Sequence, residues 1–163
     1  MRLTPRTLHA SSTTDISRLV ALDQRSATNP WTMASFARCL GKPKNHGIGV
    51  YDSKDALRGY VIYDSSLPGE LSIVSLLVDS GFRRIGIGSG LLDCVRAGMN
   101  SIGLEARFSV YFPEDDDVLV KFFTSYKTSR RLYLQTSLVR GGPKEPRDWY
   151  CFSFQEALSG VCA

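Results

Sequence analysis

The amino-acid sequence predicts an α/β (α+β) fold, in which helices flank a central sheet. Segments with the hydrophobic period of strands or of helices follow one another in the order β-α-α-β-β-β-α-β-α-β-β. One of these strands leads through a glycine-rich turn into an amphipathic helix. The 163 residues are 43% hydrophobic and 22% charged, which is typical of a globular domain with a full core. We therefore expect residues 1–163 to form a single domain.

The first half of the chain predicts three strands and two helices. The expected strands lie between turn residues and cover 6–10, 46–51 and 57–64. Thr13 begins the first helix, because Thr-Thr-Asp is typical of a helix start and apolar residues follow at helical spacing. Thr32 is the expected N-cap of the second helix, and Gly41 is its expected end. The polar residues 52–56 predict a hairpin turn.

The second half predicts four strands and two helices. The expected strands cover 70–78, 106–112, 131–139 and 149–154. The first of the two helices ends near residues 98–101, and its apolar face is formed by Leu91, Leu92, Val95 and Met99. Pro113 and the acidic residues 114–117 introduce the second helix, which runs through Phe122 and Tyr126. A turn-rich loop containing Gly-Gly-Pro separates the last two strands.

The turn after residue 78 is the most informative part of the sequence. Arg83 and Arg84 supply positive charge, and the small residues Gly86, Gly88, Ser89 and Gly90 leave backbone N–H groups open where a helix begins. Free N–H groups, the positive end of the helix dipole and two guanidinium groups favour a bound phosphate or pyrophosphate. The alternative is an ordinary glycine-rich connection between a strand and a helix.

Two well-known phosphate loops fit this turn less well. A Walker loop needs a Lys-Ser/Thr pair, which is absent, and a dinucleotide fingerprint needs G-x-G-x-x-G directly after the first strand. The spacing that fits is Arg83-x-x-Gly86-x-Gly88 after a strand that ends in Val78-Asp79. It resembles the acetyl-CoA signature of the GNAT superfamily of N-acetyltransferases, R/Q-x-x-G-x-G/A after Val-Asp.

A second pair of motifs resembles one branch of that superfamily. Asp23-x-Arg25 is followed by Pro30-Trp31-Thr32 between the first two helices. The ribosomal-protein alanine N-acetyltransferases of bacteria carry a similar E/D-x-R and P-W-[ST] pair at this place, which implies a role on the substrate side. The alternative for Trp31 is a hydrophobic staple ahead of the second helix.

The resemblance covers most of the chain and implies the GNAT fold. This fold has a central, mixed, mostly antiparallel sheet of six to seven strands, splayed between strands 4 and 5, with helices on both faces. Acetyl-CoA is the implied cosubstrate: its pantetheine arm lies in the gap like an extra strand, and its pyrophosphate lies on the amides of the glycine turn. The implied cofactor-binding residues are Leu76, Leu77, Val78, Arg83, Arg84, Ile85, Gly86, Ile87, Gly88 and Ser89. The two arginines are alternatively solvated surface charges.

The catalytic half of the implied site departs from the family pattern. Acetyl transfer needs a deprotonated amine, a backbone donor for the oxyanion, here near Leu77 or Val78, and an acid for the leaving thiolate. The ribosomal-protein acetyltransferases carry a glutamate in the strand after the signature helix and a tyrosine on the next helix. Ser109 stands where this glutamate is expected, and Phe122-Phe123 stand where the tyrosines are expected.

Two residues are candidate replacements for the missing acid and base. Glu70 opens the signature strand, where other branches place a water-relaying base; the alternative is a solvated carboxylate. Tyr126 lies one helical turn after Phe122 and is the candidate acid, with a core tyrosine as the alternative. The acidic residues 114–117 either bind a cationic substrate or favour the helix N-terminus, and His46 is interpreted as an edge-strand residue.

Composition limits the partners. Four scattered cysteines (Cys39, Cys94, Cys151 and Cys162) and only two histidines predict neither a metal site nor a disulfide framework, so we expect free thiols in the cytoplasm. No apolar run reaches membrane-spanning length, and the N-terminus does not have the apolar core of a signal peptide. The net charge of +4 mildly favours an anionic ligand but is too dispersed to predict nucleic-acid binding. The chain is expected to be a monomer or a homodimer.

Three functions follow from these observations. The first is an N-acetyltransferase that transfers the acetyl group of acetyl-CoA to a primary amine by direct attack in a ternary complex. The amine belongs to a protein N-terminus, a lysine or a small molecule. The second is a CoA-binding sensor or partner module that has lost catalysis. The third is a basic binding domain with no CoA role.

Overall fold

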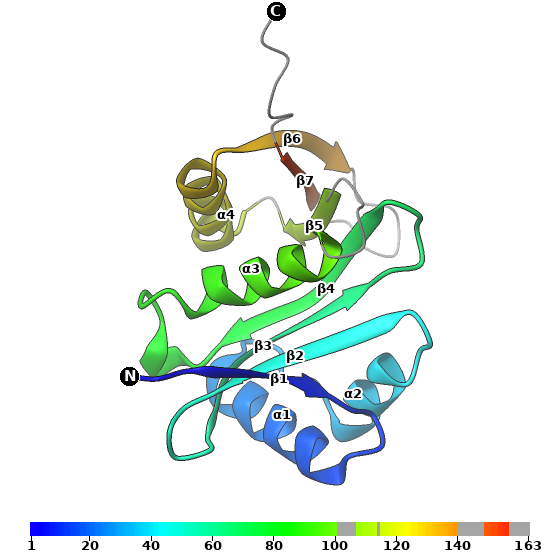
Figure 1. The fold of residues 1–163 in the computed structure, drawn as a ribbon, viewed down its shortest axis with the longest axis vertical. Helices are drawn as coiled ribbons and strands as arrows, with labels where there is room; N and C mark the ends of the chain where they lie inside the picture. Colours follow the sequence, from blue (N-terminus) through cyan, green and yellow to red (C-terminus); the bar gives the residue numbers. More distant parts are fainter. Residues whose placement is uncertain (101–106, 114, 140–148, 157–163) are drawn as a thin grey trace, which may run out of the picture.

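The computed structural model describes residues 1–100, 107–113, 115–139 and 149–156, which form a seven-stranded sheet with helices on both faces (Figure 1). The elements, in chain order, are β1 (Thr4–Leu8), α1 (Thr13–Ser26), α2 (Met33–Leu40), β2 (Asn45–Tyr51), β3 (Leu57–Asp64), β4 (Glu70–Val78), the 3₁₀ turn η1 (Ser80–Phe82), α3 (Ile87–Asn100), β5 (Arg107–Pro113), α4 (Asp117–Arg130), β6 (Leu132–Val139) and β7 (Trp149–Glu156). The strand order is β1-β2-β3-β4-β5-β7-β6. The pair β4–β5 is parallel, and the other five pairs are antiparallel.

This architecture confirms the predicted fold class and the predicted order of strands and helices, with shifts at some ends. The first strand ends at Leu8, before the predicted residue 10, because the amide of His9 donates to the side chain of Asp15 in the first turn of α1. β6 begins one residue later than predicted, because Arg131 adopts a left-handed conformation (φ 53°) as the C-cap of α4. The turn η1 was not predicted. The predicted loop of residues 141–146 and the strand residue Ala106 lie outside the described residues.

The sheet separates two apolar clusters (Figure 1). Helices α1 and α2 cover one face with residues that include Leu19, Leu22 and Phe36. Helices α3 and α4 cover the other face, where Leu91 and Phe123 are among the buried residues. Because side chains alternate along a strand, β4 contributes Leu76 and Val78 to the α3 face and Leu77 to the α1 face.

A glycine in β3 lets α3 lie close to the sheet. A Cβ atom at Gly59 would lie 2.9 Å from Cγ2 of Ile87, the first residue of α3. Ile87 is itself buried against the sheet. The contact between these two residues therefore sets the start of α3 directly over β3 and β4.

The strands β4 and β5 separate after a short paired segment. Their pairing runs from Glu70 opposite Arg107 to Ile73 opposite Val110. At the same point, the pairing of β4 with β3 shifts register and leaves Val74 as an extra residue, which is a β-bulge. Beyond this bulge, β4 continues to Val78 with no strand of the described chain paired to its second edge. This separation confirms the predicted splay.

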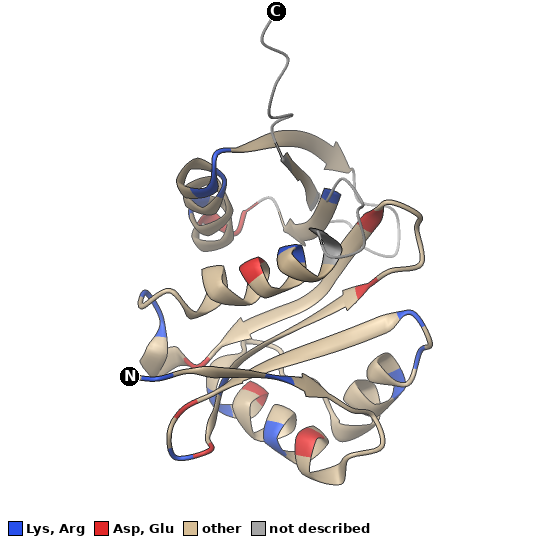
Figure 2. Cartoon of the chain, viewed as in Figure 1, with Lys and Arg blue, Asp and Glu red and all other residues tan. Residues whose placement is uncertain are grey.

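Charges of both signs are interleaved over the chain. Acidic and basic residues alternate along α1 and α3, whereas α4 has Asp117 at its start and only Lys or Arg among its later charges (Figure 2). A long apolar helix of the kind that crosses a bilayer does not occur in the part of the chain that the structure describes.

Candidate functional site

The open edge of β4 forms one wall of the candidate site. Residues 75–78 extend past the last pair with β5, so the backbone groups on that edge have no ladder partner in the described chain. Leu76 and Val78 face α3, whereas Ser75 pairs with Ile62 and faces α1. The edge can therefore receive an extended ligand as a further strand.

The glycine turn lies at the end of this open edge. Arg84 (φ 63°) and Gly86 (φ 93°) both adopt left-handed conformations, which turn the chain sharply into α3. The amide of Gly90 was predicted to be free, but it makes the first helical bond, to the carbonyl of Gly86. The amides of residues 83–89 donate to no acceptor in the described chain. They form a group of free donors at a helix N-terminus, which suits an anion.

A buried carboxylate holds the start of this turn. Asp79 accepts hydrogen bonds from Arg25 of α1 (3.0 Å), from Arg58 of β3 (3.0 Å) and from the amide of Gly81 (3.3 Å). Burial acts to raise the pKa of Asp79, but the bonds from Arg25 and Arg58 outweigh it and lower the pKa. The guanidinium of Arg58 also stacks on Phe82, 4.0 Å from the ring centroid. The turn is thus fixed to both α1 and the sheet.

The two arginines of the motif have different environments. Arg83 donates to the carbonyl of Val78 (3.2 Å) and to the carbonyl of Ser26 at the end of α1 (2.9 Å). The hydroxyl of Ser26 in turn accepts from the amide of Ser80. Arg84 is exposed, and its guanidinium contacts no partner in the described residues. Arg84 is therefore available for an anion, whereas Arg83 ties the turn to α1.

The other predicted cofactor residues gather around the turn and the open edge. Ile85 is 58% exposed beside Gly86, whereas Ile87 is buried and offers only its amide. Gly88 lies against α4, because a Cβ atom there would be 3.1 Å from Cζ of Phe122. The structure thus brings together Leu76, Leu77, Val78, Arg84, Ile85, Gly86, Ile87, Gly88 and Ser89, and it directs Arg83 toward α1.

Tyr126 is part of the packing between α3 and α4. It is 1% exposed, its hydroxyl donates to Asp93 of α3 (2.8 Å), and the guanidinium of Arg130 lies 5.2 Å from its ring centroid. Burial and the bond to Asp93 raise the pKa of Tyr126 to about 12. This geometry favours the core alternative over the role of catalytic acid.

Glu70 lies at the closed end of the β4–β5 pair. It is opposite Arg107 in the register, and five residues of strand separate it from Ser75, which is about 17 Å. Glu70 is half-buried. Its position favours the alternative of a carboxylate at the end of the strand over that of a base acting in the gap.

Other candidates from the sequence have structural partners. The side chain of Asp116 accepts from the amide of Leu119 and caps α4, and residue 114 lies outside the described residues. His46 of β2 packs on its pairing partner Tyr63 of β3, with 5.2 Å between ring centroids. The side chain of Trp31 packs on Phe36, with 5.2 Å between centroids.

The sequence analysis missed one polar chain beside the gap. The carboxylate of Asp23 accepts from the amide of Trp31 (2.9 Å) and from the hydroxyl of Tyr60 (2.8 Å). That hydroxyl lies 3.1 Å from Oγ of Ser75 on the open part of β4. The E/D-x-R motif pointed to Asp23, but no local pattern indicates that Tyr60 and Ser75 contact it. Ser109, in place of the family glutamate, is buried with its Oγ 3.3 Å from that of Ser72.

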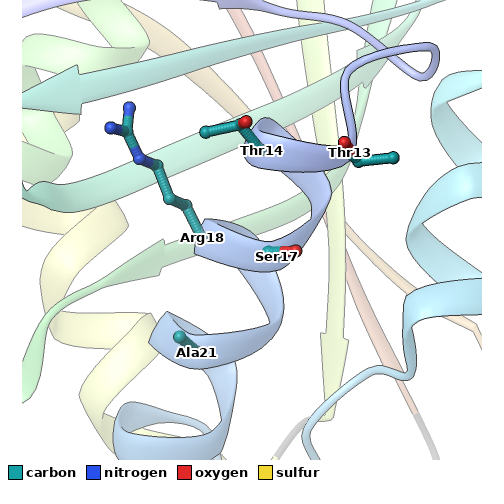
Figure 3. Close-up of a pocket in the computed structure, with 5 residues that line it drawn as sticks. All are labelled: Thr13, Thr14, Ser17, Arg18 and Ala21. Carbon is teal, nitrogen blue, oxygen red and sulfur yellow. The ribbon is translucent and has the colours of Figure 1, made fainter.

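The described residues form no second site of comparable chemistry. No group of three or more His, Cys, Asp or Glu side chains that could hold a metal ion lies within residues 1–100, 107–113, 115–139 and 149–156. A shallow hollow lies along the first turns of α1, lined by Thr13, Thr14, Ser17, Arg18 and Ala21 (Figure 3). Arg18 in this hollow is already paired with Asp55 (2.7 Å), so its charge is engaged.

Comparison with known proteins identifies the fold. No family model and no curated protein matches the sequence. Among solved structures, the ribosomal-protein-S18-alanine N-acetyltransferase from Escherichia coli is 16% identical and matches over 99% of each chain with a TM-score of 0.75. Arabidopsis thaliana NAA60, in complex with acetyl-CoA, is 14% identical over 98% of this chain and 100% of its own, with a TM-score of 0.73. An acetyltransferase of the GNAT family from Streptococcus pneumoniae is 12% identical over 96% of this chain and 100% of its own, with a TM-score of 0.67. The chain therefore has the GNAT fold, as the sequence predicted.

Proposed function

We propose that residues 1–163 form one acetyltransferase domain, which transfers an acetyl group from acetyl-CoA to a primary amine. The amine belongs to a protein N-terminus, a lysine side chain or a small molecule. The observation that carries the proposal is the combination of an open β4 edge with a glycine turn whose amides at residues 83–89 are free. Two structures of the same fold support it: one is described as an N-acetyltransferase, and the other is in complex with acetyl-CoA.

The chain's own groups divide the binding of acetyl-CoA between two places. The free amides of residues 84–89 and the guanidinium of Arg84 bind the diphosphate, because they combine open donors, a helix dipole and a positive charge. The backbone of residues 76–78 bonds to the pantetheine arm as a neighbouring strand would. The acetyl carbonyl then lies in the gap, where a backbone amide near Leu77 or Val78 stabilises the oxyanion.

The amine attacks the thioester carbonyl directly, and the coenzyme leaves as a thiolate. Holding both reactants in one groove supplies much of the rate, since the attack then becomes effectively intramolecular. The usual glutamate is absent, because Ser109 stands in its place. The acid and base of this reaction therefore have to come from other groups or from solvent.

The alternative is a CoA-binding module without catalysis. The replacement of the glutamate by Ser109 and the engaged hydroxyl of Tyr126 favour it. Such a module would bind acetyl-CoA at the same turn but would leave every amine unmodified.

One assay separates the two functions. The chain is incubated with acetyl-CoA and one of three amines: a peptide with a free N-terminal alanine, an N-terminally blocked peptide with one lysine, and spermidine. Release of CoA thiol together with an added acetyl group in the mass spectrum supports the transferase. A rise of the melting temperature with acetyl-CoA, without acetylation of any amine, supports the module. Neither binding nor turnover contradicts both.

A further inference from the structure

Three side chains from three elements form a continuous polar chain in an apolar part of the molecule. Asp23 of α1 and Tyr60 of β3 are 2% and 1% exposed, and Tyr60 belongs to the apolar cluster beneath α1 and α2. Ser75 of β4 is half-buried and links them to the open part of the strand. Polar groups in such surroundings are costly unless each hydrogen bond is made.

The direction of the hydrogen bonds follows from the number of protons. The ionised carboxylate of Asp23 only accepts, and the single hydroxyl proton of Tyr60 is donated to its Oδ1. The 3.1 Å contact between Tyr60 and Ser75 therefore requires Ser75 to be the donor. The lone pairs of Ser75 Oγ are then left to accept a proton from a substrate.

Ser75 lies where an attacking amine would arrive. It follows the bulge residue Val74 directly, so it is the second residue after the last pair of β4 with β5. Its side chain faces α1, opposite the face of Leu76 and Val78 that is turned toward α3. A ligand held on the glycine turn at the start of α3 leaves this opposite side for the second substrate.

The surrounding groups keep the hydrogen bonds between Asp23, Tyr60 and Ser75 in place. The second carboxylate oxygen of Asp23 is held by the amide of Trp31, which leaves Oδ1 to Tyr60. Burial raises the pKa of the Tyr60 hydroxyl far above its usual value, so that it transmits a proton without ionising. Among the described residues, the other titratable group that acts on Tyr60 is the thiol of Cys39 on α2, and burial raises its pKa as well.

We propose that Ser75, Tyr60 and Asp23 form a proton relay for the attacking amine, with Ser75 as the catalytic residue and the other two as positioning residues that act through it. This proposal rests on the proposed acetyl transfer. As the new C–N bond forms, the ammonium proton passes to Oγ of Ser75, the Ser75 proton to Tyr60, and the Tyr60 proton to Oδ1 of Asp23. The C–S bond breaks, the thiolate takes a proton from water, and Asp23 returns its proton to water by the reverse path.

The relay explains how the chain functions without the family glutamate. Ser109 has no ionisable group, and its hydroxyl is buried beside Ser72. The carboxylate of Asp23 cannot touch the amine, because it is buried between α1 and the sheet. The hydroxyl groups of Tyr60 and Ser75 connect it to the gap between β4 and β5.

The test compares Ser75→Ala, Tyr60→Phe and Asp23→Asn with the wild type and with Tyr63→Phe. Tyr63 lies on the same strand as Tyr60 but packs on the α3 side, so Tyr63→Phe is the matched control. The probe is whichever of the three amines above the wild type acetylates fastest, and kcat/KM is measured from pH 6 to pH 10. Loss of a general base typically lowers the rate by about 100-fold or more, so we expect that loss at pH 7.

The pH dependence separates a relay from a structural role. We expect the loss to shrink as the pH rises, because hydroxide then removes the proton that the relay would have taken. Ser75→Thr keeps a hydroxyl and should recover most of the activity. Combining Ser75→Ala with Asp23→Asn should cost no more than Ser75→Ala alone, since the residues act as one unit.

The possible outcomes separate the relay from the acetyl transfer on which it rests. A loss that is equal at every pH, or variants that behave like Tyr63→Phe, overturns the relay while the acetyl transfer stands. A wild type that shows no melting shift with acetyl-CoA and acetylates none of the three amines overturns the proposed function and the relay together. Variants that retain the wild-type melting shift with acetyl-CoA but lose turnover in the pH-dependent manner support the relay.

Discussion

Ile73 and Val110 are the last residues at which β4 and β5 pair, and the bulge at Val74 follows at once. A bulge increases local twist and ends pairing, so it explains why the two strands separate here. The separation places the free edge of residues 75–78 directly before the glycine turn. The open edge of β4 and the glycine turn are thus continuous, and together they form the proposed binding site.

Gly88, in the first turn of α3, lies against Phe122 of α4. Because a Cβ atom at this position would lie 3.1 Å from Phe122, we expect Gly88→Val to overpack the contact and to lower the free energy of unfolding by about 1–3 kcal/mol. Urea denaturation measures this change. Gly90→Ala is the control, since a Cβ atom at Gly90 meets nothing within 4 Å and should instead stabilise the helix by about 0.5–1 kcal/mol. Equal stability of the two variants would show that this contact is loose.

The two arginines of the motif should have separable effects. Arg84→Ala should leave the melting temperature unchanged and weaken acetyl-CoA binding by about threefold, because an exposed ion pair contributes less than about 1 kcal/mol. The effect should fade at high salt, and Arg84→Lys should restore most of the affinity. Calorimetric titration at two salt concentrations measures it.

Arg83→Ala should instead act on stability. Its two hydrogen bonds to the carbonyls of Val78 and Ser26 contribute about 1 kcal/mol each, so the melting temperature should fall without acetyl-CoA present. If Arg83→Ala weakened binding but left the melting temperature of the free chain unchanged, the assignment of roles would be reversed.

Asp79 should give the chain an acid-sensitive stability. Since the folded-state pKa of Asp79 is lowered, its contribution is present above the unfolded-state pKa of about 3.9 and is lost as the pH falls through the lower folded-state value. We expect Asp79→Asn to cost about 2 kcal/mol at pH 7, because charge-assisted hydrogen bonds from Arg25 and Arg58 are weakened. Urea denaturation between pH 7 and pH 2 should show the wild type and the variant converging below pH 4. Parallel curves throughout would contradict this assignment.

Tyr126→Phe tests whether this tyrosine is an acid or a core residue. Removal of its hydroxyl leaves Asp93 paired with Arg130 (2.7 Å), so we expect a loss of about 1 kcal/mol of stability and turnover within about twofold of the wild type. A fall in kcat of about 100-fold or more would instead identify a catalytic acid. The measurement combines denaturation with steady-state kinetics at one pH.

Local sequence signals were sufficient for the strands and helices around the site. The expected bounds of β3 and β4 agree with the structure, because turn residues flank both strands. Thr32 and Gly41 were identified as the ends of α2 by their capping chemistry, and the structure confirms both. Such signals operate within a few residues and need no knowledge of the fold.

The partners of the functional side chains could not be predicted in this way. Arg83 bonds to a carbonyl 57 residues earlier, and Tyr126 bonds to Asp93 across 33 residues. Both contacts depend on how helices cross the sheet, which no local pattern encodes. Glycines, amides and charge were enough to predict an anion site, because its expected donors lie within one short turn. The polar chain that begins at Asp23 draws on three elements and was visible only in the structure.

Binding of the acetyl-CoA diphosphate by the amides of the glycine turn can be measured by calorimetric titration of acetyl-CoA into matched variants. Ser89→Asp places a carboxylate in the first turn of α3, where it favours the helix dipole but repels an anion. Thr14→Asp makes the same change in the first turn of α1, away from the gap. We expect the wild type and Thr14→Asp to bind equally, and Ser89→Asp to bind at least about tenfold more weakly, a difference of about 1.4 kcal/mol. Equal affinity in all three proteins, or no binding by the wild type, would contradict it.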